Sequence, residues 1–233
     1  KLMIGDDSLL LVNQQVSVLD DAQVRKYVSG LAFHWYTSNV IAPYSSLSSL
    51  VDTLKDKIEF VIMSEACNGA YTPWKHVDLG SWQRGEAYAV DIIEDMRRQT
   101  GAWIDWNLAL DEQGGPNWSH NYVDSPIIVN KASNSFQKQP MYYVLAHFSR
   151  FFRPGSIRVA SELENGSYFE KIMTLSALNN KTGHLVVNIL NKATSARHLS
   201  LRVEPDGVLT KKAYELGPFQ VDGKSISTVV LKL

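Results

Sequence analysis

Carboxylate, imidazole and phenol side chains follow two short apolar segments in the first half of the sequence. Glu65 comes directly after Phe60–Ser64, and His34 and Tyr36 close the stretch Gly30–Tyr36. An ionised carboxylate is costly in an apolar interior unless it is paired, so Glu65 is expected either in a polar pocket or in a strand-end salt bridge. Carboxylates beside aromatic rings suit a sugar, and a glutamate can attack an anomeric carbon when a second carboxylic acid faces it.

Two more apolar segments also end in polar or aromatic residues. Asp6 and Asp7 follow Leu2–Ile4, and Trp106 ends the segment Ala102–Trp106. One aspartate is expected to hold hydrogen bonds of the site and the other to cap a helix, and we assign substrate binding to Asp6. Trp106 is expected to stack against a sugar, the alternative being a core aromatic.

The segments that carry these residues alternate with stretches of helical spacing. The four apolar segments are the predicted strands, and the predicted helices between them are Asp20–Val28, Ser46–Ile58 and Ser81–Thr100. This alternation predicts parallel βα units, whose strands meet with their carboxyl ends at one edge, where ligands bind. The spacing suits either an open doubly wound sheet or part of a (β/α)8 barrel.

The rest of the sequence departs from this rhythm. Residues 107–139 are rich in Gly, Pro and Asn and predict a loop or a small β excursion, whereas Met141–Phe152 predicts an amphipathic helix. From residue 156 onward, short alternating segments between turn residues predict a β-sandwich portion. We therefore predict two domains, an α/β domain over 1–155 and an all-β domain over 156–233.

Composition excludes some classes of function. The 233 residues carry a formal net charge of −1 and no basic cluster with interleaved aromatics, so no nucleic-acid partner is expected. No apolar run approaches the ~20 residues that span a bilayer. Cys67, the only cysteine, is interpreted as a small buried hydrophobe. Glycosylation sequons at Asn117, Asn165 and Asn180 favour a secretory-pathway glycoprotein.

Several motifs together resemble the retaining glycosidases of family 30. The resemblance covers essentially the whole chain and rests on SEACNG, GLAFHWY, DWNLALDEQGGPNW and KQPMYYVLAHFSRFFRPGS. It implies that Glu65 is the catalytic nucleophile at the end of the seventh strand of a (β/α)8 barrel. It places His34 and Tyr36 in the sixth-strand group that lines the sugar pocket. Trp106 falls on the eighth-strand tryptophan against the sugar, and Asn121 on a loop asparagine near it.

One part of the family's pattern is missing. The acid/base glutamate of the family lies on an Asn-Glu-Pro motif at the fourth strand, and the sequence contains no such tripeptide. The resemblance implies that this residue lies upstream of Lys1, in a missing amino-terminal half of the same protein. We therefore expect the carboxyl-terminal half of a (β/α)8 barrel followed by part of a β-sandwich.

The resemblance also implies a substrate and a setting. Within the family, the animal lysosomal branch hydrolyses glucosylceramide to glucose and ceramide, without a metal or cofactor. It implies a lysosomal, membrane-associated but not membrane-spanning protein, with an anionic lipid surface and a saposin-type activator as partners. The alternative is a non-catalytic glycan- or lipid-binding fragment, or a degenerate paralogue that keeps the pocket without the acid.

Overall fold

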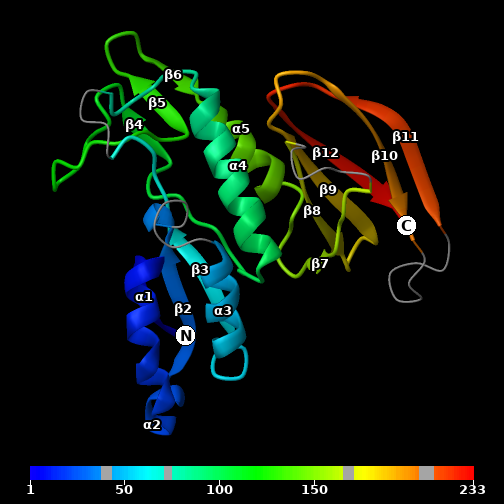
Figure 1. The fold of residues 1–233 in the computed structure, drawn as a ribbon. Coiled ribbons are helices and arrows are strands. Elements are labelled where there is room, and N and C mark those ends of the chain that lie inside the picture. Colours follow the sequence, from blue (N-terminus) through cyan, green and yellow to red (C-terminus); the bar gives the residue numbers. More distant parts are fainter. Residues whose placement is uncertain (38–43, 71–74, 165–170, 205–212) are drawn as a thin grey trace. The chain divides into compact units, whose positions relative to one another are not determined.

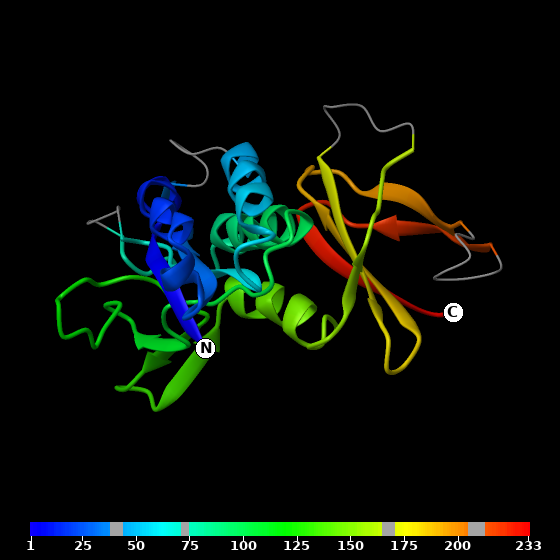
Figure 2. The ribbon, with the colours of Figure 1, turned by 90° about the horizontal axis from the view of Figure 1, so that it is seen from below.

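The computed structural model describes the chain in two compact units (Figures 1 and 2). The described residues are 1–37, 44–70, 75–164, 171–204 and 213–233. The first unit comprises Lys1–Ser81 with Glu94–Gln139, and the second comprises Trp82–Ile93 with Pro140–Leu233. The longest helix, α4 (Trp82–Arg97), contributes residues to both units and lies within the predicted range.

The first unit is built on a parallel sheet in the order β1-β2-β3. Its strands correspond to the first three predicted: β1 (Leu2–Ser8), β2 (Val28–His34) and β3 (Phe60–Glu65). The helices α1 (Leu9–Gln15) and α3 (Tyr44–Leu54) pack on this sheet (Figure 1). Their shared core explains why the strands read as apolar runs, and its fully buried members include Leu9, Leu31, Phe33, Leu47 and Met63.

The fourth predicted strand, Ala102–Trp106, is not a regular strand. The segment runs parallel to β3, but only one bridge forms, between Met63 and Trp103. Its backbone bonds fall on Met63 and then on Ala66, which lies beyond the end of β3, so the ladder stops early. Within the described residues the parallel strands form an open sheet and no closed barrel.

The helical prediction between β1 and β2 was partly wrong. The range Asp20–Val28 holds only the end of a 3₁₀ turn, η1 (Val16–Asp20), and the short helix α2 (Ala22–Arg25), capped by the Asp21 carboxylate. Val28 already pairs with β1, which forces the helix to end before it. The seven-residue helix α1 was missed because it is too short to show a clear period.

The segment 107–139 contains a small sheet in the order β4-β5-β6 (Figure 1). Its strands are β4 (Ala109–Asp111), β5 (Ile127–Asn130) and β6 (Ser135–Lys138). The turn after β4 needs a glycine at position 114, where φ is +89° and a Cβ would lie 2.4 Å from the Val123 carbonyl oxygen.

The second unit contains α5 (Pro140–Ser149) and two antiparallel sheets that share one apolar core. Six strands form them: β7 (Ile157–Val159), β8 (Ile172–Asn179), β9 (His184–Asn191), β10 (Arg197–Val203), β11 (Tyr214–Val221) and β12 (Ser225–Lys232). Both faces of β9 are buried. The sequence did not predict β11, because Gly217-Pro218 interrupts its alternation.

A polar group joins α5 to the four-stranded sheet of this unit. His147 Nδ1 lies 2.7 Å from Thr228 Oγ1, which donates to Asn188 Oδ1 at 2.6 Å, and Asn188 Nδ2 donates to the His147 carbonyl at 3.1 Å. Burial lowers the pKa of His147, because the charged ring is poorly solvated there.

This burial predicts a loss of stability in mild acid. The unfolded chain binds a proton at His147 near its ordinary pKa of ~6.5, whereas the folded chain binds it at lower pH. We therefore expect the free energy of unfolding to fall as pH decreases below ~6.5, measured by urea unfolding at several pH values. His147→Gln should remove this component, and an unchanged pH profile in that variant would contradict the prediction.

Candidate active site

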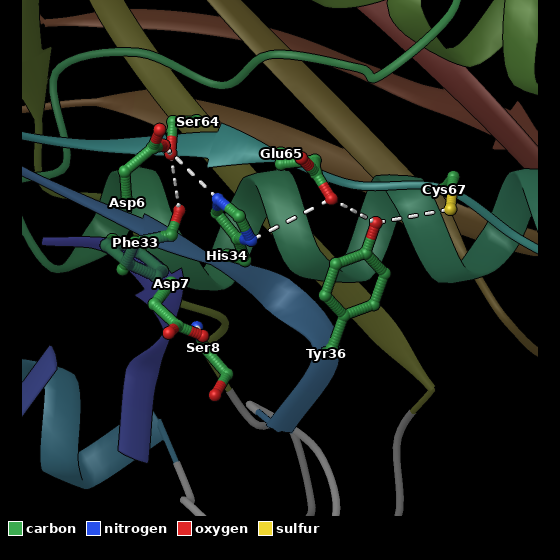
Figure 3. Close-up of polar contacts among 9 residues, drawn as sticks. All are labelled: Asp6, Asp7, Ser8, Phe33, His34, Tyr36, Ser64, Glu65 and Cys67. Carbon is green, nitrogen blue, oxygen red and sulfur yellow. Dashed lines mark hydrogen bonds and ion pairs between the residues drawn. The ribbon is translucent and has the colours of Figure 1, made fainter. Parts of the chain in front are cut away.

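Two β-bulges shape the carboxyl edge of the parallel sheet. Asp6 is the extra residue between the pairs Gly5–Ala32 and Asp7–Phe33, and Ser64 is the extra residue between Phe33–Met63 and His34–Glu65. Bulges re-aim side chains at the end of a ladder. Here they turn residues from three strands towards one another at this edge (Figure 3).

The first bulge depends on an unusual backbone. Gly5 and Asp6 have φ values of +89° and +66°. A Cβ at position 5 would lie 2.4 Å from the Ala32 carbonyl oxygen, so this position requires glycine. Aspartate is among the few residues that tolerate the left-handed region that Asp6 occupies.

Glu65, the last residue of β3, lies between a phenol and an imidazole. Its Oε1 accepts a hydrogen bond from the Tyr36 hydroxyl at 2.8 Å and lies 3.7 Å from His34 Nδ1 (Figure 3). The side chain keeps 28% of its accessible surface. Within the described residues, Oε2 of Glu65 has no hydrogen-bond or ion-pair partner. Among the described residues, the carboxylate is therefore held at Oε1 and open at Oε2.

Asp6 completes the other side of the imidazole. Asp6 Oδ1 lies 3.1 Å from His34 Nε2 and accepts a hydrogen bond from Ser64 Oγ at 2.8 Å, so the two bulge residues contact each other across β2. The Ser64 bond, followed by that of His34, holds the pKa of Asp6 below its usual range. Asp7 instead accepts from the Ser8 backbone N–H at the start of α1. Asp6 therefore takes part in the hydrogen bonds of this edge, whereas the expected helix cap by the other aspartate does not form, since the N-cap residue of α1 is Ser8 and no side-chain cap occurs there within the described residues.

Tyr36 lies on the short 3₁₀ turn η2 (Trp35–Thr37) rather than on β2 as predicted. Its hydroxyl contacts Glu65 on one side and Cys67 Sγ, at 3.2 Å, on the other. Burial is the main reason why the pKa of Tyr36 is raised far above its usual value. The phenol therefore stays neutral: it donates a hydrogen bond to the Glu65 carboxylate and keeps its proton.

The remaining two predicted residues lie outside this hydrogen-bonded group. Trp106 is half-buried and packs, like Tyr36, against an apolar cluster of Cys67, Leu110, Val123 and Ile128. Asn121 is exposed in the loop after β4, and in the part of the chain that is described no hydrogen bond or ion pair joins it to Glu65. The structure therefore brings together Glu65, Tyr36, His34 and Asp6, and packs Trp106 against the same apolar cluster as Tyr36.

Sequence reasoning missed two members of the site. Cys67 follows Glu65 by two residues, a spacing that puts side chains on the same side of an extended chain, and this signal could have identified it. Ser64 gave no signal, because its contact with Asp6 depends on the two bulges.

Parallel strands bring a partly exposed carboxylate, an imidazole and a phenol to one edge of the sheet. This arrangement is typical of glycosidases, whose chemistry uses carboxylates placed at strand ends. The sequence model of the glycosyl hydrolase family 30 TIM-barrel domain matches residues 1–152. The chain belongs to glycosyl hydrolase family 30, as its motifs suggested.

Known proteins similar to this chain agree with that assignment. The chain is 41% identical over 195 residues to putative glucosylceramidase 4 of Caenorhabditis elegans, covering 82% of this chain and 36% of the relative. It is 40% identical over 205 residues to the lysosomal acid glucosylceramidase of Mus musculus, covering 88% and 38%. The chain thus spans less than half the length of these curated relatives.

Solved structures show the same fold. SrfJ from Salmonella typhimurium superposes with a TM-score of 0.76 at 26% identity, over 97% of this chain and 46% of that one. A family 30 endoxylanase from Clostridium papyrosolvens has a TM-score of 0.68 at 16% identity, over 100% and 56%. The second likeness concerns the fold alone.

Proposed function

We propose that this chain supplies the nucleophile of a retaining β-glucosidase that hydrolyses glucosylceramide to glucose and ceramide. The observation that carries the proposal is the Glu65 carboxylate, which is held at Oε1 by Tyr36 and open at Oε2. The names of the worm and mouse relatives support the choice of lipid substrate.

In the first step, Oε2 of Glu65 attacks the anomeric carbon as the bond to the ceramide oxygen breaks. A carboxylic acid protonates the departing oxygen, and a glycosyl ester forms on Glu65. In the second step, the group that acted as the acid is a carboxylate and removes a proton from water. The water attacks the anomeric carbon, breaks the ester bond to Glu65 and releases glucose. Each step inverts the configuration at the anomeric carbon, so the two steps together retain it.

The proton donor is proposed to lie in a part of a longer protein outside this chain. The family's Asn-Glu-Pro motif does not occur in the sequence, and the matched relatives are more than twice as long. One carboxylate cannot serve as nucleophile and proton donor together. We therefore expect the isolated chain to be inactive.

The proposed setting is the lysosome, at an anionic lipid surface and with a saposin-type activator. The support is the name of the mouse relative and the exposed sequon at Asn180, in the turn between β8 and β9. Asn117 is half-buried, and Asn165 lies outside the described residues. No helix among the described residues is long and apolar enough to cross a membrane.

Covalent labelling tests the proposal directly. The complete protein would be incubated with a 2-deoxy-2-fluoro-β-glucoside, which forms the glycosyl ester and hydrolyses slowly, and then digested and mapped by mass spectrometry. Label on Glu65, together with release of glucose from glucosylceramide, is the expected result. Label on another residue would remove Glu65 from its role. Binding of the lipid without any turnover would support the non-catalytic alternative.

Trp106 provides a second test of the sugar site. Trp106→Ala should lower kcat/KM for a β-glucoside by the equivalent of about 1–3 kcal/mol, because a large apolar face is lost from the pocket. Trp118, which is 94% exposed in the segment 107–139 that follows Trp106, gives a matched control, and Trp118→Ala should leave kcat/KM for a soluble glucoside unchanged. Equal kcat/KM for Trp106→Ala and the unmodified protein would make Trp106 a core residue.

A further inference from the structure

Cys67 is a buried thiol that the proposed reaction does not use. It is 4% exposed and belongs to the apolar cluster with Leu110, Val123 and Ile128. A cysteine in such a cluster ordinarily only fills space. Here, however, its Sγ lies 3.2 Å from the Tyr36 hydroxyl oxygen, which in turn contacts the Glu65 carboxylate (Figure 3).

The direction of these two hydrogen bonds follows from the number of protons. The Tyr36 hydroxyl has a single hydrogen, and it points to Oε1 of Glu65 at 2.8 Å, because an ionised carboxylate can only accept. Tyr36 can therefore only accept on the side of Cys67, and the thiol must donate. Burial raises the pKa of the Cys67 thiol to about 12, so the S–H proton is present throughout the working range of proteins.

We propose that Cys67 is a positioning residue: its S–H donates to the Tyr36 oxygen and thereby directs the Tyr36 hydroxyl proton onto Glu65. Without this donor, the hydroxyl can rotate about its C–O bond away from Glu65. With it, the two hydrogen bonds run in one direction and polarise each other. The catalytic part of this inference rests on the proposed role of Glu65.

A thiol that only fills space predicts different variants from a thiol that donates. Cys67→Val keeps an apolar group of similar size and removes the donor. Cys67→Ser keeps a donor on a similar stem. Packing therefore favours the Val variant, whereas hydrogen bonding favours the Ser variant, and the order of the two separates the explanations.

Infrared spectroscopy tests the hydrogen bond independently of catalysis. Difference spectra of the complete protein against Cys67→Val isolate the S–H stretching band of this residue from any other thiol. We expect the band to move to higher frequency in Tyr36→Phe, because donation to an oxygen weakens the S–H bond and phenylalanine offers no oxygen. An unchanged band in Tyr36→Phe would overturn the proposal, whether or not the protein is a glucosidase.

Kinetics test the effect on Glu65. A neutral hydrogen bond corresponds to about a two- to tenfold change, so Cys67→Val should lower kcat by about that factor and Cys67→Ser should recover most of it. In Tyr36→Phe, the additional Cys67→Val substitution should have no further effect. An equal loss in both backgrounds would overturn the positioning role, and thermal unfolding of each variant identifies losses due to misfolding. Absence of glucosidase activity in the unmodified protein would instead contradict the proposed function, and the infrared result would still decide the hydrogen bond.

Discussion

Glu65→Gln is expected to lower kcat/KM for a β-glucoside by about 10⁴-fold or more, the largest effect among the predicted substitutions. The amide has nearly the size of the carboxylate but no negative charge, so it cannot form the glycosyl ester. Tyr36 and His34 remain in place, so binding of the glucoside should change far less than kcat. Steady-state kinetics of the complete protein measure both quantities.

The other end of β3 offers a matched control. Glu59 directly precedes the strand and forms an exposed ion pair with Lys1, so Glu59→Gln should leave kcat/KM unchanged.

Azide adds a stereochemical test of the Glu65→Ala variant. The azide ion should attack the anomeric carbon from the face that the carboxylate vacates and give the α-glucosyl azide. Formation of the β-glucosyl azide would assign Glu65 the acid/base role and contradict the prediction.

Asn191→Ala is expected to lower the free energy of unfolding by about 3 kcal/mol. Asn191 is fully buried at the end of β9, where Nδ2 donates to the carbonyls of Ser195, Val221 and Asp222 at 3.0, 3.3 and 2.9 Å. Its Oδ1 accepts from the Ala193 N–H at 3.0 Å. Truncation leaves several backbone groups without partners, which costs more than a single hydrogen bond contributes. Urea unfolding measures the loss.

Asn179, at the turn between β8 and β9, provides the comparison. Its Oδ1 accepts from Lys181 N and Thr182 N at 3.0 and 3.3 Å, but water can replace these exposed bonds. Asn179→Ala should therefore cost less than about 1 kcal/mol. Asn191→Asp removes the donor and keeps the shape, so it should be at least as harmful as alanine. A near-neutral Asn191→Asp would show that the three carbonyl contacts contribute little.

The sequence predicted the elements whose pattern is set by burial. β2 and β3 were found because apolar residues on both faces give continuous runs, and α4 because it is long enough to show its period. β11 was missed because a proline interrupts its alternation, although the strand pairs with β10 on both sides of that point. Local patterns fail where tertiary pairing decides the conformation.

The candidate site likewise contains features that the sequence predicts and features that only the fold decides. Glu65, His34 and Asp6 could be placed at strand ends, and strand ends converge in any parallel sheet. The contacts between them depend on the bulges at Asp6 and Ser64, which are set by the pairing of three strands rather than by local sequence. Asn121 lies in the segment 107–139, and Trp106 packs against residues of that segment, whose irregular backbone has no periodic signal. The roles of all the candidate site residues stay predictions.

The parallel sheet of the first unit and the four-stranded sheet of the second unit differ in how far apart along the chain their paired strands lie. This difference has a consequence for the order of folding. β8 and β9 form a hairpin joined by a turn of four residues, so each pairing closes a short loop. β1, β2 and β3 pair in parallel and meet only after each crossover has formed. Closing longer loops costs more conformational entropy before any contact stabilises them. We therefore expect the hairpin of the second unit to acquire protected amides early in refolding, and the edge that holds Glu65 to assemble late.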